Sequence, residues 1–304
     1  MAVFLRALGF IESVNFCGLN QFAKARASIQ RTLGQNGMQD KIKQSTSSAM
    51  ANEEQKPQPL QGCVAIVIGA SGGIGREITI HLALKGAKIL LIYSSNPQKA
   101  EEVAATINSD TSVTAAIAFR ADISDPAQVI GLFNKAEEAF GPVHIIVNSA
   151  GVMDTKYSSL AEISEQDWDK TFNINCKGAF LYSKEAAKRL VHGGRGRIIN
   201  ITTSLVGALM PGYAAYAASK AVVETMTKIL AKELRGTKII VNCVAPGPIA
   251  TEFFFAGKSE AVIKAIEGRS PLEQLGVVQD VAPLVGFLAS DEGEWVNAQV
   301  VRVN

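Results

Sequence analysis

Two ionisable side chains, Tyr216 and Lys220, stand four residues apart at the start of a long helical pattern. Residues at this spacing lie on one face of a helix. A free phenol has a pKa of about 10 and is seldom ionised at neutral pH. An ammonium about 5 Å away, at an effective dielectric near 20, favours the phenolate by about 3 kcal/mol, or about two pKa units. The pair therefore predicts a tyrosine that exchanges protons near physiological pH, provided that other motifs place it in a site.

A glycine-rich stretch, residues 69–75, follows the first apolar run directly and leads into a helical pattern. Its sequence is Gly-Ala-Ser-Gly-Gly-Ile-Gly. Glycines let the backbone turn tightly and approach a pyrophosphate, which the free N–H groups and the positive end of the helix then bind. Because strand, loop and helix occur in this order, the stretch predicts a dinucleotide site rather than a plain turn.

The end of the second apolar run indicates which nicotinamide cofactor is preferred. An acidic residue there would bind the adenosine ribose of NAD and repel a 2′-phosphate. The run ends in Tyr-Ser-Ser-Asn, and the hydroxyls of Ser94 and Ser95 carry no charge. Arg76 and Lys99 are the basic residues expected nearby. The segment favours NADPH, although a polar turn without a cofactor role has the same composition.

The elements that must position these residues alternate between short apolar runs and helical stretches from residue 62 onward. This alternation is typical of βαβ units and a parallel sheet covered on both faces. We predict an α/β, single-domain, Rossmann-type, doubly wound parallel sheet with helices on both faces. Its seven strands are expected at residues 63–68, 88–93, 114–120, 143–148, 197–202, 239–244 and 300–303, with helices that include 74–85, 128–140, 166–190 and 213–234.

Residues 1–59 differ from the remainder and are treated as a leader, with the predicted domain at 60–304. From residue 1 to 51 the only acids are Glu12 and Asp40, against six lysines and arginines. This basic composition resembles an organelle transit peptide, which would place the protein in a chloroplast or mitochondrion. Alternatively, translation starts at Met50, the leader is a gene-model extension and the protein is cytoplasmic. In either case we expect the leader to be disordered and to carry no function.

Composition excludes several other classes. The formal net charge is +2, from 30 basic and 28 acidic residues, and the body has no dense basic tract, so nucleic acid is not an expected partner. No apolar run is long enough to cross a bilayer, so no membrane partner is expected. The four cysteines and three histidines are scattered without ligand spacing, so no metal site is expected.

Five motifs in order make the chain from residue 62 to 304 resemble the short-chain dehydrogenase/reductase family. They are the glycine-rich stretch 69–75, Asn-Ser-Ala-Gly at 148–151, Asn175 within 173–178, Tyr216 with Lys220, and Pro246-Gly247 before Thr251. Within the family the likeness is greatest to plant NADPH-dependent aldehyde reductase-like proteins, through residues 221–255 and 293–297. Bacterial-type 3-oxoacyl-carrier-protein reductases are a more distant match.

The resemblance implies residue roles. Tyr216 would protonate the substrate carbonyl, Lys220 would lower its pKa and hold the nicotinamide ribose, and Asn175 would hold a water between Lys220 and solvent. Asp122 would contact the adenine, although Asp122 and Asn148 also suit turns or caps. The expected cofactor-binding residues are Gly69, Ser71, Gly73, Ile74, Gly75, Ser94, Ser95, Asp122, Asn148, Ala150, Gly151, Tyr216, Lys220, Pro246, Gly247, Ile249 and Thr251.

The catalytic hydroxyl is ambiguous. The family's serine commonly lies thirteen positions before the tyrosine, which here is Thr203, whereas Ser204 begins a run, Ser-Leu-Val-Gly, that resembles the family's serine motif. Loops change length more readily than strand ends change register. We therefore assign the carbonyl-polarising role to Ser204, with Thr203 as the alternative.

Relatives commonly extend beyond the last strand with a short tail that supports a subunit interface, so a chain stopping at Asn304 could be truncated.

Aromatic residues after the sixth strand suggest the substrate. Phe253 to Phe255 precede a short predicted helix, 260–267, that would cover the nicotinamide end of the cleft. With Met153, Met210 and Tyr213 they predict an apolar pocket for a small-molecule carbonyl substrate, although they also suit packing beneath a lid or against another subunit.

The leading hypothesis is an NADPH-dependent carbonyl or aldehyde reductase that forms a homo-oligomer, a dimer or tetramer. The alternatives are a catalytically weak NADP-binding regulatory or assembly subunit and an NAD-dependent alcohol or polyol dehydrogenase.

Overall fold

The structure, a computed structural model, describes residues 58–109 and 115–304. Seven strands lie in one parallel sheet. They are β1 (Val64–Ile68), β2 (Lys88–Tyr93), β3 (Ala116–Arg120), β4 (Ile145–Asn148), β5 (Arg197–Ile201), β6 (Ile240–Pro246) and β7 (Val300–Val303).

The strand order is β3-β2-β1-β4-β5-β6-β7. The chain therefore builds outward from β1 to β3 and then returns to the other side of β1 with β4. In open sheets of this kind, ligands bind outside the carboxyl ends of the strands where the order reverses. This rule points to the ends of β1 and β4, which are neighbours in register from Ala65 opposite Ile145 to Ile68 opposite Asn148.

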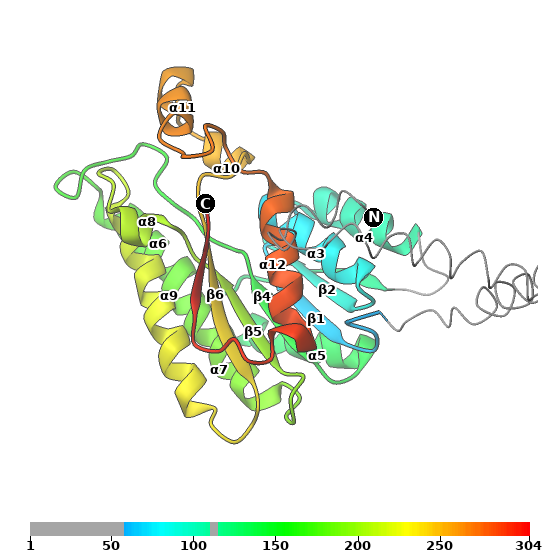
Figure 1. The fold of residues 1–304 in the computed structure, drawn as a ribbon. Coiled ribbons are helices and arrows are strands. Elements are labelled where there is room, and N and C mark those ends of the chain that lie inside the picture. Colours follow the sequence, from blue (N-terminus) through cyan, green and yellow to red (C-terminus); the bar gives the residue numbers. More distant parts are fainter. Residues whose placement is uncertain (1–57, 110–114) are drawn as a thin grey trace, which may run out of the picture. The chain divides into compact units, whose positions relative to one another are not determined.

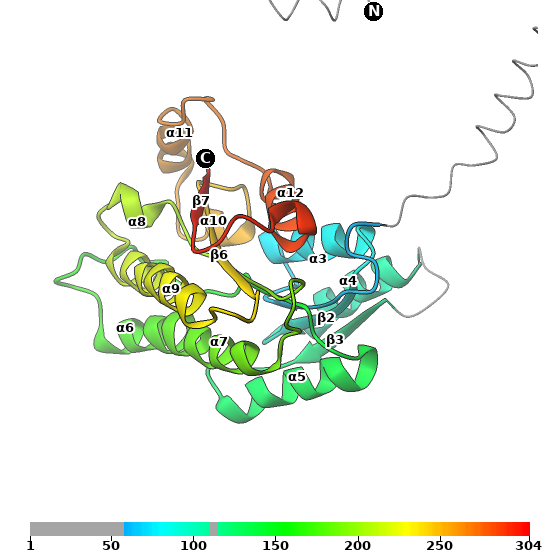
Figure 2. The same ribbon diagram turned by 60° about the horizontal axis from the view of Figure 1, so that its bottom comes forward.

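Helices cover both faces of the sheet, and Figure 2 shows α3 and α12 on one face and α5, α7 and α9 on the other. The longer helices are α3 (Gly73–Leu84), α4 (Pro97–Ser109), α5 (Pro126–Phe140), α6 (Glu165–Phe172), α7 (Gly178–Arg189), α9 (Ala214–Glu233), α11 (Glu260–Glu267) and α12 (Val278–Ala289). Shorter ones are the π-helical turn η2 (Asn173–Lys177), α8 (Leu205–Ala208), α10 (Glu252–Phe255) and the 3-10 turn η3 (Asp291–Gly293). In Figure 1, α10 and α11 lie beyond the carboxyl ends of the strands.

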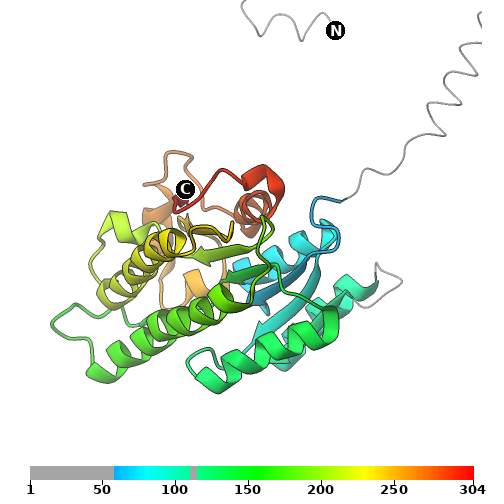
Figure 3. The ribbon, with the colours of Figure 1, turned by 90° about the horizontal axis from the view of Figure 1, so that it is seen from below.

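The alternation of side chains along the strands divides the core in two. Along β1, Ala65 and Val67 pack with α3, α4 and α12, whereas Val64, Ile66 and Ile68 pack with α5, α7 and α9. All five are buried, because a parallel strand covered on both faces is apolar throughout. Figure 3 shows α5, α7 and α9 running side by side on the second face.

The predicted fold is confirmed, and the differences lie at element ends and in one interrupted helix. The expected strand 143–148 is shorter, β6 continues to Pro246, and residue 114 lies outside the described residues. The expected helix 166–190 is interrupted by η2, which sequence periodicity did not indicate. The short helix 260–267 is confirmed as α11. Within residues 58–109 and 115–304, no helix has the length and apolarity needed to span a membrane.

Candidate active site

The glycine-rich loop joins β1 to α3 at the switch point, and its glycines are required by close approach. A Cβ on Gly75 would lie 2.1 Å from the carbonyl oxygen of Gly69, and one on Gly69 would lie 2.8 Å from the backbone nitrogen of Ala150. Gly69 and Gly73 also have positive φ, +76° and +51°. The N-cap of α3, Gly72, has no side chain to bind the first N–H groups of the helix. The loop therefore presents free backbone donors suited to a pyrophosphate.

The turn after β4 completes this end of the sheet. The buried Asn148 side chain accepts a hydrogen bond from the backbone N–H of Ala150 at 3.1 Å. Asn148 itself does not line the cleft, whereas Ala150 and Gly151 do. A Cβ on Gly151 would lie 3.2 Å from Lys220 Nζ and 3.5 Å from Asn175 Oδ1. Asn148 thus stabilises the turn, and the lack of a side chain on Gly151 leaves room for Lys220 Nζ and Asn175 Oδ1.

A basic residue that the sequence analysis missed, Arg120, lines the cleft beside Ser94. Arg120 ends β3 opposite Tyr93, and its Nε donates a hydrogen bond to the carbonyl oxygen of Ser94 at 3.1 Å. Ser95 and Arg76, expected here, do not line the cleft. Pairing the ends of the second and third predicted strands would have revealed Arg120, because neighbouring parallel strands end at the same edge.

Lys99, the other basic residue expected near Ser94, is bound to a carboxylate. Its Nζ lies 2.8 Å and 2.9 Å from the two carboxylate oxygens of Glu252. Both side chains are substantially exposed, so the pair contributes little stability. It nevertheless connects α4 with α10.

Asp122 lines the cleft as expected, and its Oδ1 accepts hydrogen bonds from the N–H and the hydroxyl of Ser124, at 2.8 Å and 2.7 Å.

Asn175 lies in the π-helical turn η2 and is almost fully buried. Its Oδ1 accepts the N–H of Val152, and its Nδ2 donates to the carbonyl oxygen of Val152 and the hydroxyl of Ser219, each at 2.9 Å. The Ser219 hydroxyl in turn donates to the carbonyl oxygen of Tyr216 at 2.7 Å. Single π turns inside helices occur often at functional sites. Here the turn directs an amide between the loop after β4 and the first turns of α9.

Lys220 is 3% exposed and lies one turn after Tyr216 on α9. Its ammonium donates to the carbonyl oxygens of Ile201 at 2.9 Å and Ala150 at 3.4 Å, and lies 5.9 Å from the centroid of the Tyr216 ring. Burial lowers the pKa of Lys220 to about 8, against the opposing effect of nearby Cys243 and Cys176. The predicted proximity of the pair is thus observed.

The predicted lowering of the Tyr216 pKa is wrong. Burial instead raises the pKa of Tyr216 above its usual value. Burial removes the water that would stabilise the phenolate, and the Lys220 ammonium faces two backbone carbonyls. The desolvated phenol therefore keeps its proton. At neutral pH the side chain is therefore a proton donor rather than a phenolate.

Both candidate hydroxyls, Ser204 and Thr203, line the cleft after β5. Thr203 is buried, and its Oγ1 accepts a hydrogen bond from the N–H of Leu205 at 3.3 Å. Ser204 is half-buried, and its hydroxyl has no hydrogen-bond partner among the described residues. Its backbone is fixed, since its N–H donates to the carbonyl oxygen of Pro246 at 2.9 Å. Ser204 therefore has the hydroxyl that is free to bind a substrate.

The segment after β6 extends from the glycine-rich loop to Tyr216. A Cβ on Gly73 would contact the methyl group of Thr251 at 3.5 Å. The Thr251 hydroxyl caps α10 by accepting the N–H of Phe254 at 3.1 Å. Phe253 then packs against Tyr216, with ring centroids 5.9 Å apart. Phe255 does not line the cleft, contrary to expectation.

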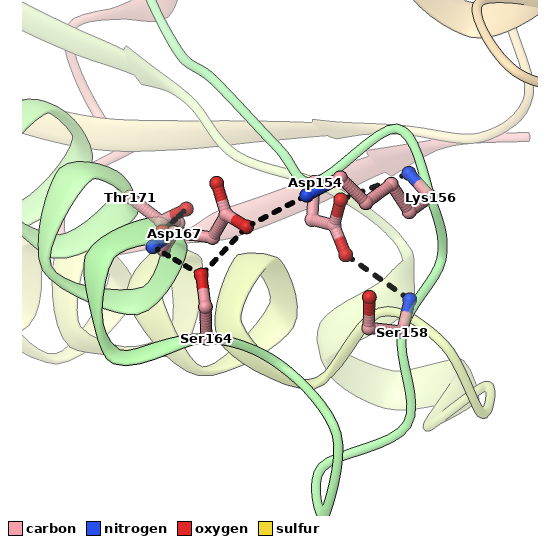
Figure 4. Close-up of polar contacts among 6 residues, drawn as sticks. All are labelled: Asp154, Lys156, Ser158, Ser164, Asp167 and Thr171. Carbon is pink, nitrogen blue, oxygen red and sulfur yellow. Dashed lines mark hydrogen bonds and ion pairs between the residues drawn. The ribbon is translucent and has the colours of Figure 1, made fainter.

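Tyr157, from the loop after β4, meets this segment from the other side, and the sequence analysis did not identify it. The loop is held by Asp154, whose carboxylate accepts the N–H groups of Lys156 at 2.8 Å and Ser158 at 3.1 Å, and by an ion pair of 3.2 Å between Lys156 and Asp167 (Figure 4). The Tyr157 hydroxyl donates to the carbonyl oxygen of Ala256 at 2.6 Å. These bonds join the loop after β4 to the end of α10.

One cavity of about 960 Å³ runs from Ser94 to this aromatic end, which is ample for a dinucleotide and a small substrate. Most of the predicted residues line it: Gly69, Ser71, Gly73, Ile74, Ser94, Asp122, Ala150, Gly151, Ser204, Tyr216, Lys220, Pro246, Gly247, Ile249 and Thr251. Four do not: Gly75, Ser95, Asn148 and Asn175. Of these, Gly75, Asn148 and Asn175 are buried beside lining residues and shape the site, whereas Ser95 is exposed.

Comparison with known proteins gives matches over this same part of the chain. A family model described as enoyl-(acyl carrier protein) reductase matches residues 69–304. A short-chain type dehydrogenase/reductase from Picea abies is 62% identical, covering 81% of this chain and 92% of that protein. A protein from Arabidopsis thaliana named NADPH-dependent aldehyde reductase-like protein, chloroplastic, is 55% identical, covering 84% and 98%.

Solved structures agree with the sequence matches. A short-chain dehydrogenase from Burkholderia cenocepacia, crystallised in complex with NADP, superposes with a TM-score of 0.75 at 34% identity, covering 81% of this chain and 98% of that one. A dehydrogenase/reductase from Sinorhizobium meliloti gives the same TM-score at 33% identity, covering 81% and 95%.

Proposed function

Because the chain belongs to the short-chain dehydrogenase/reductase family, we propose that it reduces a small aldehyde or ketone with NADPH, with Tyr216 as the general acid. At the level of class, the predicted oxidoreductase with NADP as cofactor is confirmed by the family and by relatives named for NADPH-dependent reduction. The observation that carries the finer proposal is a single cavity that joins the glycine-rich loop to Tyr216, Lys220 and Ser204.

The residues present fit the pyrophosphate and the 2′-phosphate of NADPH. The glycine-rich loop forms a cradle that a Cβ on Gly69 or Gly75 would fill, and it faces the uncapped start of α3. At the far end, Ser94 and the guanidinium of Arg120 offer a hydroxyl and a positive charge to a 2′-phosphate, with no carboxylate in the segment 93–96. We assign the phosphate contact to Arg120 rather than Arg76.

When bound, NADPH supplies the hydride that adds to the carbonyl carbon of the substrate. The carbonyl oxygen then gains an electron pair and takes a proton from the Tyr216 hydroxyl, while the Ser204 hydroxyl donates a hydrogen bond to the same oxygen. Burial keeps Tyr216 protonated before this step. Lys220 is mostly charged at pH 7, since its pKa is about 8, and an ammonium beside the phenolate left by proton transfer stabilises it.

The test replaces Tyr216 with phenylalanine and follows NADPH consumption with a panel of aldehydes, diketones and quinones. We expect turnover to fall about 100- to 10,000-fold, the usual contribution of a general acid, while NADPH affinity is retained. Tyr213→Phe, in the same cavity, is the control and should retain most activity. Full turnover in Tyr216→Phe would overturn the assignment.

Two other outcomes separate the rival functions. Tight NADPH binding by the wild-type protein without turnover of any carbonyl would favour a regulatory or assembly subunit. Tighter binding of NAD than of NADP, with oxidation of alcohols or polyols, would favour an alcohol dehydrogenase. Neither alternative is supported by a feature of the site, in which Tyr216, Lys220 and Asn175 are all present.

We propose a chloroplast location on the basic composition of residues 1–51, which lie outside the described residues, and on two chloroplastic relatives from Arabidopsis thaliana. Import of the full chain into isolated chloroplasts, with cleavage of the leader, is the expected result. An endogenous protein that begins at Met50 would contradict the proposal and favour the cytoplasm.

A further inference from the structure

The proposed mechanism leaves unused a lysine at the substrate end of the cleft, Lys258. It follows α10, lines the same cavity as Tyr216 and is half-buried. Its ammonium lies 4.6 Å from the ring centroid of Tyr157, 4.5 Å from that of Phe254 and 5.9 Å from that of Tyr213. A cation over the faces of three rings is held in place from several sides.

The charge of Lys258 has no carboxylate partner among the described residues. Its ammonium donates to the hydroxyl of Tyr157 at 2.6 Å and to the carbonyl oxygen of Phe254. An ammonium has three donors, so one remains. Burial also lowers the pKa of Lys258, with no opposing carboxylate. A half-buried cation with a spare donor and no counter-charge is suited to an anion.

The nearest acidic group on the adjoining loop, Asp154, does not supply that counter-charge. Its two oxygens already accept the N–H groups of Lys156 and Ser158 (Figure 4). It lies close enough to Tyr157 to affect the pKa of that phenol, but it makes no ion pair with Lys258.

Lys258 lies at the same end of the cavity as Tyr216. The segment after β6 passes from Thr251, beside the glycine-rich loop, through Phe253, against Tyr216, to Lys258. Tyr213 is the N-cap of α9, three residues before Tyr216, and Lys258 lies over the Tyr213 ring. Lys258 and Tyr216 thus line one cavity and contact neighbouring rings, Phe254 for the ammonium and Phe253 for the tyrosine.

We propose that Lys258 is an anion subsite and that the preferred substrates are small aldehydes or ketones bearing a carboxylate a few carbons from the carbonyl. This inference rests on the proposed reductase function. The carboxylate accepts the free N–H of Lys258 and provides its missing counter-charge, while the chain between the two groups lies against Phe253, Phe254 and Tyr213. Binding at both ends would hold the carbonyl at Tyr216.

The experiment compares 4-oxobutanoate with its methyl ester, which removes the charge and keeps the aldehyde. A charge-assisted hydrogen bond in a partly buried site corresponds to a preference of about 10- to 100-fold in kcat/KM for the acid. Lys258→Met should abolish this preference, because kcat/KM for the acid should fall about 10- to 100-fold more than kcat/KM for the ester. Lys258→Arg should retain it in part, and Lys264→Met, an exposed lysine on α11, should retain it fully.

A purely structural role for Lys258 predicts a different result, because loosening the aromatic end would reduce turnover of both substrates equally. That result, or a wild-type enzyme that reduces the ester as well as the acid, would overturn the subsite. If the wild type reduces neither aldehyde, the proposed reductase function is in doubt, and the subsite is tested by calorimetry. Succinate should then bind to the protein–NADP complex more tightly than to the complex of Lys258→Met, and equal binding would refute it.

Discussion

Replacing Arg120 by methionine tests whether the preference for NADPH originates at the ends of β2 and β3. Methionine has a similar reach and removes the charge, the Nε donor to the carbonyl oxygen of Ser94 and any contact with a 2′-phosphate. The β2–β3 register, with Tyr93 opposite Arg120, fixes the backbone on both sides and does not depend on the side chain. The change should therefore affect the cofactor more than the fold.

The magnitude follows from the exposure of Arg120. Arg120 is exposed, and in water two unit charges 4 Å apart interact by about 1 kcal/mol, whereas a phosphate monoester carries about 1.5–2 negative charges at neutral pH. The product, about 2 kcal/mol, agrees with the range of about 1.5–3 kcal/mol for a hydrogen bond to a charged group. It corresponds to about 30-fold weaker NADPH binding, with less effect at high salt, where exposed charges are screened.

The assay is a fluorescence titration of the protein with NADPH and with NADH. We expect Arg120→Met to weaken NADPH binding about 30-fold and to leave NADH binding unchanged, and Arg120→Lys to lie between the wild type and the methionine variant. Arg76→Met is the control, because Arg76 is exposed and outside the cleft. Equal weakening of both cofactors, or an Arg76→Met that behaves like Arg120→Met, would refute the reasoning.

Three further predictions concern the rest of the site. Ser204→Ala should reduce kcat while Thr203→Val leaves it largely intact, measured as NADPH-dependent aldehyde reduction; the reverse pattern would assign the role to Thr203. Gly75→Ala should abolish NADPH binding in titrations because its methyl group would meet the Gly69 carbonyl oxygen, whereas Gly131→Ala, where nothing lies within 4 Å, should not weaken binding. Burial lowers the pKa of Lys220 from about 10.4 to about 8, so the unfolded state binds this proton more tightly than the folded state does. As pH rises from 8 to 10.4, the wild type should therefore gain up to about 3 kcal/mol of stability relative to Lys220→Met. Urea unfolding at several pH values measures this gain, and a stability difference that stays constant with pH would contradict it.

The features that the sequence could predict are those encoded by neighbouring residues. Short apolar runs that alternate with helical stretches identified the seven strands, and strand–loop–helix order identified the glycine-rich loop as part of a site. The proximity of Tyr216 and Lys220 followed from helical spacing, and the accompanying motifs indicated that the pair belongs to a site. In each case the interacting groups belong to one element or to two consecutive elements, so the chain itself fixes their separation.

The residues that the sequence could not identify belong to segments that meet only in the folded chain. Lys258 becomes notable because Tyr157, about a hundred residues earlier, packs its ring and hydroxyl against it. Arg120 becomes notable because β3 pairs with β2. The π-helical turn at Asn175 was not indicated by apolar periodicity, and the side chain of Asn175 bonds to Val152 and Ser219, which belong to two other segments.

The pKa of Tyr216 shows why a spacing argument reached the correct pair and the wrong direction. Four residues on a helix fix how far apart two backbones lie, but not which acceptors the lysine reaches. Here Ile201 and Ala150 offer carbonyl oxygens to the ammonium, and the phenol loses water without gaining a hydrogen bond from it. Desolvation of the phenol therefore determines the direction of its pKa, which is raised. The same burial keeps the proton on Tyr216 at neutral pH, which is the state that a carbonyl reduction requires of its acid.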